Sequence, residues 1–504
     1  MSTGKVWLVG AGPGGIGLFT VKGMEVLNNA DVVVYDSLVG MSILSKIPAD
    51  AEAVNVGKRA SNHTMAQSEI TRLLVRKAKE GHKVVRLKGG DPFLFGRGGE
   101  EVELLQKENI PFEIVPGITS PIAVPAYNGI PVTHRDFCSS VHIITGHKKQ
   151  GDKYDIDFKA LVDTKGTLVF LMGVGALKDI CDSLIKAGMD NDMPAAILQK
   201  GTTAGQKRIV ATVSTLYDEV QKQGIETPAI IVVGKVCSLS EEFAWYEKLP
   251  LSGYKVLLTR PAEAGSVLAE KLRKKGAEVV ENPSIKTIPL SDQSKLYESL
   301  ENMDKYDWLV FTSPIGVKIF FDELKNVRKD IRCLGNIKVA VIGQGTRKIL
   351  EEKGIFADIM PEIYDGENLG ITLREHLKYG EKIFIPRAKI GGKELIEEIS
   401  KKEGVEIFDI PTYDTIYVSN DIIDEKDIFE TGEIDCAVFT SSSTVKGFTE
   451  SLKELDYAKV KAACIGMQTK ATADSFGMKT YMAEKATIDS LVELIVNMKN
   501  KKQE

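Results

Sequence analysis

Short apolar segments alternate with longer, charged and amphipathic segments along almost the whole chain. Val, Ile and Leu dominate the short segments, which is typical of strands buried on both faces of a sheet. The clearest predicted strands are 6–9, 32–35, 84–87, 141–145, 168–171 and 230–233. Strands that alternate with amphipathic helices in this way predict α/β layers with largely parallel sheets.

The chain is too long for a single hydrophobic core. Its 504 residues, 43% hydrophobic and 27% charged, predict several globular domains. The pattern breaks after Pro250, where Ser252 precedes a new predicted strand at 255–259. We therefore predict two modules with few contacts between them. They are 1–248, with lobes of about 1–131 and 132–248, and 253–504.

The second module contains an internal repeat. The segment 307–313 is echoed by 435–441, and 339–343 with Thr346 is echoed by 462–466 with Thr469. Two copies offset by about 125 residues indicate two similar lobes rather than a solenoid. The predicted lobes are about 290–411 and, discontinuously, 253–285 plus 416–500. Two strands that cross between these lobes make a hinge plausible.

Charge and composition exclude several classes of protein. A net charge of −5 argues against nucleic-acid binding, which normally needs a basic surface. No apolar run approaches the ~20 residues that cross a bilayer, and the chain starts without signal-peptide features, so we expect a cytoplasmic protein that does not bind membranes. The six scattered cysteines show no zinc spacing, which predicts reduced thiols and no metal site.

A glycine-rich turn follows the first predicted strand. Gly10, Gly12 and Gly15 fit the GxGxxG pattern of dinucleotide-binding folds, although a tight turn without any ligand is an equal alternative. Pro13 speaks against nicotinamide cofactors, because proline lacks one of the N–H groups that would bind pyrophosphate.

Three further turns of this kind follow predicted strands or precede helices. They are 86–93, which continues into 96–101, then 115–120 and 129–136. Paired glycines in the first allow backbone to approach a ligand closely, and Glu100 and Glu101 favour the start of a helix. Loops at the ends of parallel strands converge on one cleft, although simple loop-and-cap roles are the alternative.

These motifs, together with 56–59, 145–147, 170–173, 201–203 and 228–230, resemble the uroporphyrinogen-III C-methyltransferases of the tetrapyrrole methylase family. The resemblance runs from Val6 to about Glu247. It implies a two-lobed fold with a cleft between the lobes, a homodimer formed through this module, and S-adenosylmethionine as the methyl donor. The donor would contact Pro13, Gly89, Gly90, Asp91, Leu94, Thr119, Ser120, Met172 and Gly201.

Proton handling would fall to Asp36 and Lys58 in the matching motifs, although Lys58 can instead bind a substrate propionate. Arg97 and Arg135 are candidates for binding the acetates and propionates of the substrate, with surface ion pairs as the alternative. Gly15 departs from the family pattern, because many members carry an acidic residue there.

Hydroxyl and arginine side chains follow several strands of the second module. One such group is ordinary capping, but the series in a duplicated half resembles uroporphyrinogen-III synthase, a pair of Rossmann-like lobes joined by a two-stranded connection. This resemblance implies Tyr413 as a modest acid catalyst and no cofactor. The implied substrate-binding residues are Arg260, Ser313, Thr346, Arg387, Thr440, Ser441 and Thr469.

Together the two resemblances imply a bifunctional tetrapyrrole enzyme. It would close hydroxymethylbilane to uroporphyrinogen III with inversion of ring D, then methylate C2 and C7 to give precorrin-2. Whether precorrin-2 is used for sirohaem or for cobalamin synthesis stays open. Whether intermediates pass directly between the two modules also stays open. The rival reading is a nicotinamide dehydrogenase fused to a two-lobed binding protein, which leaves 89–91, 172–173 and 201–203 without a role.

Overall fold

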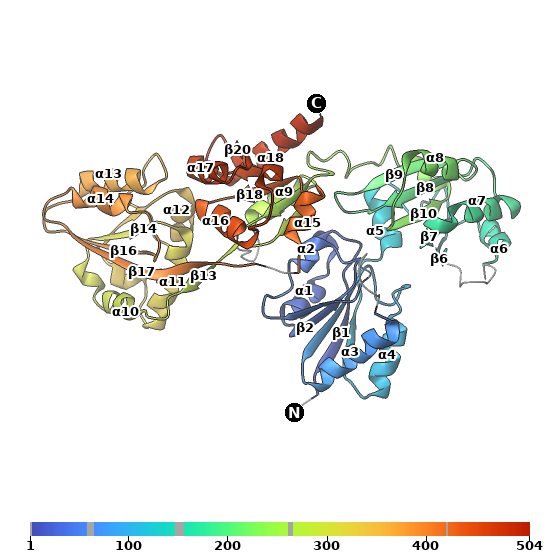
Figure 1. The fold of residues 1–504 in the computed structure, drawn as a ribbon, viewed down its shortest axis with the longest axis horizontal. Helices are drawn as coiled ribbons and strands as arrows, with labels where there is room; N and C mark the ends of the chain where they lie inside the picture. The colour runs from blue at the N-terminus through green and yellow to red at the C-terminus, as the bar shows by residue number, and fades with distance from the viewer. Residues whose placement is uncertain (1–2, 58–64, 147–155, 261–265, 420–421, 504) are drawn as a thin grey trace. The chain divides into compact units, whose positions relative to one another are not determined.

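The computed structural model describes residues 3–57, 65–146, 156–260, 266–419 and 422–503. The chain forms two compact units, Met1–Ser284 with Ser419–Glu504, and Ile285–Val418. Figure 1 shows that every sheet is accompanied by helices. There are four five-stranded sheets among the described residues, three in the first unit and one in the second. The predicted α/β class is confirmed.

The first sheet has the order β3-β2-β4-β1-β5 and is entirely parallel. Its strands are β1 (Lys5–Gly10), β2 (Val32–Tyr35), β3 (Glu52–Asn55), β4 (Lys83–Lys88) and β5 (Phe112–Val115). Side chains alternate between two cores: Val32 and Val34 pack on one face, and Val33 and Tyr35 on the other. The accompanying helices are α1 (Val21–Asn28), α2 (Met41–Leu44), α3 (Gln67–Lys79), α4 (Gly98–Lys107) and α5 (Ser120–Tyr127).

The second sheet has the order β6-β7-β10-β8-β9 and corrects the expectation of largely parallel sheets. Only β6 and β7 run parallel, because β10 is antiparallel to both neighbours and β8–β9 form an antiparallel pair across a short loop. The strands are β6 (Val141–Thr145), β7 (Thr167–Leu171), β8 (Pro194–Gln199), β9 (Lys207–Thr212) and β10 (Ala229–Val233). The helices are α6 (Phe158–Asp163), α7 (Leu177–Lys186) and α8 (Leu216–Gln223).

The third sheet, β12-β11-β18-β19-β20, combines two separate stretches of chain and is parallel throughout. Its strands are β11 (Lys255–Leu258), β12 (Glu278–Glu281), β18 (Cys436–Phe439), β19 (Lys461–Cys464) and β20 (Lys479–Met482). Its helices are α9 (Val267–Lys274), α15 (Glu425–Glu430), α16 (Ser442–Ser451), α17 (Met467–Ser475) and α18 (Ile488–Gln503).

The second unit contains the fourth sheet, β13-β17-β16-β14-β15. Tyr306 stacks on Phe384 within its core, with ring centroids 5.0 Å apart. The strands are β13 (Ile285–Pro289), β14 (Trp308–Phe311), β15 (Lys338–Val341), β16 (Lys382–Ala388) and β17 (Glu406–Tyr417). The helices are α10 (Ser294–Glu301), α11 (Pro314–Asn326), α12 (Gln344–Glu352), α13 (Gly366–His376) and α14 (Glu394–Ser400). The chain passes between the two units next to β13 and next to β17, which gives the predicted two-stranded connection.

Candidate active sites

Three glycine-containing loops meet at the carboxyl edge of the first sheet. The backbones of Gly12 and Gly90 exchange hydrogen bonds, with N to O distances of 3.1 and 2.7 Å. The amide of Gly117 donates to Oδ2 of Asp91 at 3.0 Å. The loops after β1, β4 and β5 are therefore locked to one another, as the parallel topology requires of strand ends on the same edge.

The loops approach so closely that two of their glycines leave no room for a side chain. A Cβ at Gly10 would lie 2.5 Å from the backbone nitrogen of Gly117, and a Cβ at Gly117 would lie 2.2 Å from the carbonyl oxygen of Gly90. Gly90 itself has a φ of +67°, and a Cβ built there meets nothing within 4 Å. Its left-handed backbone thus borders open space, where a ligand can approach it directly.

Other predicted donor-binding residues shape the same edge. Oδ1 of Asp91 accepts hydrogen bonds from the amides of Phe93 and Leu94, at 2.8 and 3.1 Å, which fixes the turn after β4. Thr119 occupies the N-cap position of α5, and Ser120 is the first residue of that helix. Both lie directly after the loop that carries Gly117.

The second lobe of the first module brings residues to these loops. The amide of Gly15 donates to Oγ1 of Thr202 at 3.3 Å, so a hydroxyl from the other lobe contacts the position where family members often carry an acid. A Cβ at Gly201 would lie 2.4 Å from Val124 of α5. Met172, at the end of β7, is 54% exposed with a φ of +55°. The predicted loops 10–15 and 201–203 are therefore neighbours.

Asp36 follows β2 and is oriented by its surroundings. Its Oδ1 accepts the amide of Leu38 at 3.1 Å, and its Oδ2 lies 3.6 Å from Nη2 of Arg86. The side chain is 23% exposed, so the carboxylate has a cationic partner and still reaches solvent. Lys58, the other predicted proton-handling residue, lies outside the described residues.

The two predicted substrate arginines differ in their surroundings. Arg97 has a φ of +57° just before α4 and forms two hydrogen bonds with Glu100, at 2.8 and 2.6 Å. The hydrogen bond raises the pKa of Arg97 and lowers the pKa of Glu100. Arg135 is exposed and makes no ion pair with another described residue.

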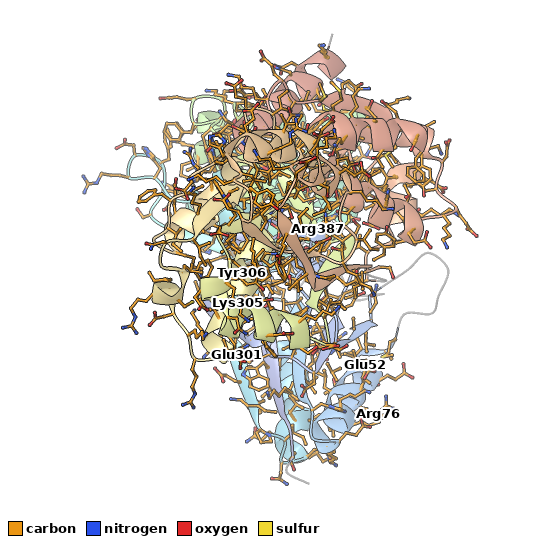
Figure 2. The ribbon with its side chains drawn as sticks, turned by 90° about the vertical axis from the view of Figure 1, so that its left-hand side faces the viewer. Glu52, Arg76, Glu301, Lys305, Tyr306 and Arg387 are labelled. Carbon is orange, nitrogen blue, oxygen red and sulfur yellow. The ribbon has the colours of Figure 1, made fainter. Side chains whose placement is uncertain are left out.

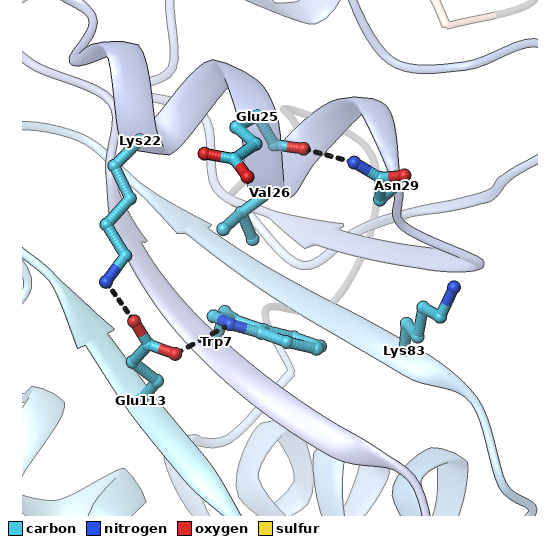
Figure 3. A pocket seen from close by; sticks show the side chains of 7 residues that line it. All are labelled: Trp7, Lys22, Glu25, Val26, Asn29, Lys83 and Glu113. Carbon is cyan, nitrogen blue, oxygen red and sulfur yellow. Dashed lines mark hydrogen bonds and ion pairs between the residues drawn. The ribbon is translucent and has the colours of Figure 1, made fainter.

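A surface hollow beside β1 contains none of the predicted site residues (Figure 3). Glu113 pairs there with Lys22 and accepts a hydrogen bond from the Trp7 indole at 3.2 Å. Hydrogen bonds from Lys22 and Lys5 lower the pKa of Glu113 to about 2. Glu113 and Lys22 are thus paired with each other, and we assign this hollow no ligand.

Two of the predicted synthase residues, Ser313 and Tyr413, are hydrogen-bonded to each other in the second unit. Ser313 caps α11 by accepting the amide of Gly316 at 2.9 Å, and its hydroxyl lies 2.7 Å from the hydroxyl of Tyr413. Burial raises the pKa of Tyr413, while the hydrogen bond with Ser313 opposes that shift. Thr346 is buried in the first turn of α12. Arg387, labelled in Figure 2, is held by the carboxylate of Asp409 at 2.6 and 2.7 Å.

The third sheet carries the repeated counterparts of these groups. Ser441 caps α16 as Ser313 caps α11, and Thr469 is buried in α17 as Thr346 is in α12. Thr440 and Arg260 are half-buried and follow β18 and β11. The structure therefore repeats the strand, capping serine and helix that the sequence repeat predicts.

Some contacts cross the predicted module boundary. The Tyr246 hydroxyl donates to the carbonyl of Gly276 at 3.3 Å, and the amide of Ala204 donates to Glu278 at 2.8 Å. Leu251, immediately after the break, is fully buried in the core of the third sheet. The apparent linker is packed, because its apolar residues are covered by the lobe that follows.

Neither metal ligation nor membrane insertion is indicated by the described residues. Within them, no group of three His, Cys, Asp or Glu side chains is placed to hold a metal ion. The same part of the chain has no helix that is long and apolar enough to span a bilayer.

Comparison with known proteins gives separate matches for the two modules. The family model of Tetrapyrrole (Corrin/Porphyrin) Methylases matches residues 5–217, and that of Uroporphyrinogen-III synthase HemD matches residues 266–493. The porphyrin biosynthesis protein HemD of Ruminiclostridium josui is 46% identical over 99% of this chain and 99% of its own length. Both resemblances indicated by the motifs are confirmed.

Two further relatives match the first module alone. The S-adenosyl-L-methionine-dependent uroporphyrinogen III methyltransferase of Methanosarcina barkeri is 50% identical over 47% of this chain and 94% of its own length. The uroporphyrin-III C-methyl transferase of Thermus thermophilus, solved with S-adenyl homocysteine, is 38% identical over 47% of this chain and 99% of that chain, with a TM-score of 0.40.

Proposed function

The chain belongs to the family of the porphyrin biosynthesis protein HemD, and from this premise we propose that it catalyses two successive steps of tetrapyrrole synthesis. The second module closes hydroxymethylbilane to uroporphyrinogen III with inversion of ring D. The first module then transfers two methyl groups, to C2 and C7, and releases precorrin-2. The 46% identity along the full length of a two-module relative carries this proposal.

The loops of the first sheet suit a bulky, polar donor. The open backbone beside Gly90 accepts close approach, and exposed Met172 offers an apolar side chain in the same module. S-adenosylmethionine, when bound, supplies an electrophilic methyl group on sulfur. Locked loops such as 10–15 and 89–91 contribute mainly by alignment, because in-line displacement depends on the geometry of the reacting atoms.

Asp36 has the properties of a proton acceptor in this reaction. After methylation a proton must leave the macrocycle, and the Asp36 carboxylate is partly exposed to receive it. Nη2 of Arg86, 3.6 Å from Oδ2 of Asp36, places a positive charge beside this carboxylate. Arg97 and Arg135 lie on exposed segments and are proposed to bind the carboxylates of the substrate.

In the synthase module the hydrogen-bonded pair of Ser313 and Tyr413 is proposed to assist departure of the hydroxyl of hydroxymethylbilane. A tyrosine hydroxyl is protonated at neutral pH, and burial raises the pKa of Tyr413 further above its ordinary value, so its hydroxyl can donate. The other predicted substrate-binding residues are proposed to guide ring closure by binding the carboxylates of the substrate. They are Arg260, Thr346, Arg387, Thr440, Ser441 and Thr469. No cofactor is required for this step.

Several finer points follow from the family resemblance and stay predictions. They are the module boundaries at 1–248 and 253–504, the homodimer formed through the first module, the cytoplasmic location, and the supply of precorrin-2 to sirohaem or cobalamin synthesis.

Purified full-length protein tests both activities. We expect hydroxymethylbilane alone to yield type III uroporphyrinogen, and added S-adenosylmethionine to convert it to a methylated product with a changed absorbance spectrum. Calorimetric titration should detect S-adenosylmethionine binding but no NAD binding, because Pro13 lacks the N–H that a pyrophosphate site would use. Formation of the type I isomer alone would refute the synthase assignment, and NAD binding without donor binding would refute the methyltransferase.

The Tyr413→Phe variant should close the macrocycle about tenfold more slowly and still produce type III isomer. The change removes only the hydroxyl that pairs with Ser313, while the rest of the buried ring stays in place. Single-turnover kinetics with isomer analysis measures both effects. Tyr379→Phe, at an 85% exposed position in the same unit, is the matched control. An unchanged rate would remove Tyr413 from the mechanism, and complete loss would make it an essential acid.

A further inference from the structure

Four charged side chains gather below the carboxyl edge of the first sheet. Glu101 of α4 is fully buried, and Arg86 and Lys88 of β4 are 3% and 6% exposed. One carboxylate oxygen of Glu101 lies 3.1 Å from Nε of Arg86 and 3.2 Å from Nζ of Lys88. Asp36, at the end of the neighbouring strand β2, completes the cluster through Arg86.

Such a cluster is costly for a small lobe. Taking ions out of water costs several kcal/mol for each, and well-packed apolar residues of similar volume often serve stability equally well. The other residues of this stretch of β4, Val84, Val85 and Leu87, are apolar and fully buried. The charges therefore point to a use beyond packing.

The contacts hold Arg86 in one orientation. Its Nε binds Glu101, and its Nη1 donates to the carbonyls of Val34 and Leu87, at 3.3 and 3.1 Å. Nη2 is thereby directed to Asp36, at 3.6 Å. Gln67 of α3 donates to the same Glu101 oxygen at 2.9 Å and fixes the carboxylate from the other side. A chain of contacts thus leads from fully buried Glu101 to partly exposed Asp36.

We propose that Glu101 is a positioning residue for methyl transfer, which acts by orienting Arg86 against the proton-accepting Asp36 and by binding the Lys88 ammonium on the same face of β4. The inference rests on the proposed methyltransferase activity. Glu101 is fully buried, and its sequence position suggests only a helix-start role.

The charge balance of the cluster supports this role. Burial and Arg86 lower the pKa of Lys88, while Glu101 and Asp36 raise it. Among the described residues, Arg97 and Glu100 at the start of α4 also interact with the charges of the cluster. Removal of the Glu101 charge lowers the pKa of Lys88 further, because its largest favourable partner is lost. The ammonium is then lost at a lower pH.

The first experiment compares Glu101→Gln with Glu103→Gln, the same change at an exposed position of α4. We expect Glu101→Gln to reduce kcat for methylation of uroporphyrinogen III about tenfold to a hundredfold, with the Kd for S-adenosylmethionine within twofold of the parent. The alkaline limb of its pH–rate profile should move to lower pH. Glu103→Gln should match the parent, and an unchanged kcat and pH profile in Glu101→Gln would overturn the proposal.

A second variant separates positioning from stability. In the triple variant Glu101→Leu with Arg86→Met and Lys88→Met, the three buried charges are replaced by apolar groups of similar volume, so Tm should return to near that of the parent even where the single variant folds poorly. Turnover should stay low, because Asp36 has lost its oriented partner. Recovery of turnover in the triple variant would mean that the three buried charges only neutralise one another, and would overturn the proposal. Failure of the parent protein to methylate would instead refute the proposed function.

Discussion

The Asp36→Asn variant is expected to have a kcat for methyl transfer about 10²- to 10³-fold below that of the parent. Its affinity for S-adenosylmethionine should be unchanged. The amide can still accept the hydrogen bond from the Leu38 amide, so the turn after β2 is retained. It carries no charge for Arg86 and is a very weak base, so the proton left after methylation loses its acceptor. The donor loops 10–15 and 89–91 are not altered by the change.

Stopped-flow absorbance gives the turnover and calorimetry gives the donor affinity in the same preparation. Asp50→Asn, at an exposed position after α2, is the matched control and should behave as the parent does. Full turnover in Asp36→Asn with normal substrate affinity would show that another group takes the proton. A parallel fall in donor affinity would instead place Asp36 at the donor.

The Gly117→Ala variant is expected to bind S-adenosylmethionine at least about tenfold more weakly. The added methyl group would lie 2.2 Å from the carbonyl oxygen of Gly90 and 2.7 Å from Cα of Gly10, so backbone on two other loops must move. Overpacking of this kind costs about 1–3 kcal/mol, and the displaced loops are those proposed to hold the donor. A shift of 1.4 kcal/mol in binding corresponds to a tenfold change in Kd.

Calorimetric titration of the donor measures this effect, with thermal unfolding to report the loss of stability. Gly175→Ala is the matched control, since a Cβ there meets nothing within 4 Å and the position is exposed. Donor affinity equal to that of the parent in Gly117→Ala would show that the three loops do not form the donor site.

Much of the first site could be predicted because its loops follow strands in a regular order. Apolar strands at 6–9 and 84–87 are visible in the sequence, and parallel strands bring the residues that follow them to one edge. The same reasoning, helped by the repeat, anticipated Ser313 and Ser441 as groups at strand ends, and both cap helices. Helix capping depends on residues that are neighbours in the chain, so it can be predicted from the local sequence.

The buried charges were missed, although a signal was present. Arg86 and Lys88 interrupt an otherwise apolar central strand, and charged residues two apart on a strand share one face. Glu101 is in the first turn of its helix, where an acidic residue is ordinary. Glu100 and Glu101 are both in this first turn, and only the tertiary contacts between α4 and β4 show that Glu101 is buried and Glu100 is exposed. The position of a residue in a helix does not show which face of the helix packs against the sheet.

Local patterns and ordered motifs were enough to predict the principal strands, the duplication of the second module and the family of each module. The tertiary structure alone decided which loops touch, that β10 runs antiparallel, that Tyr413 pairs with Ser313, and that the segment after Pro250 is packed. These contacts join residues far apart in the chain. Their geometry depends on how whole layers pack, which periodicity and motif spacing do not specify.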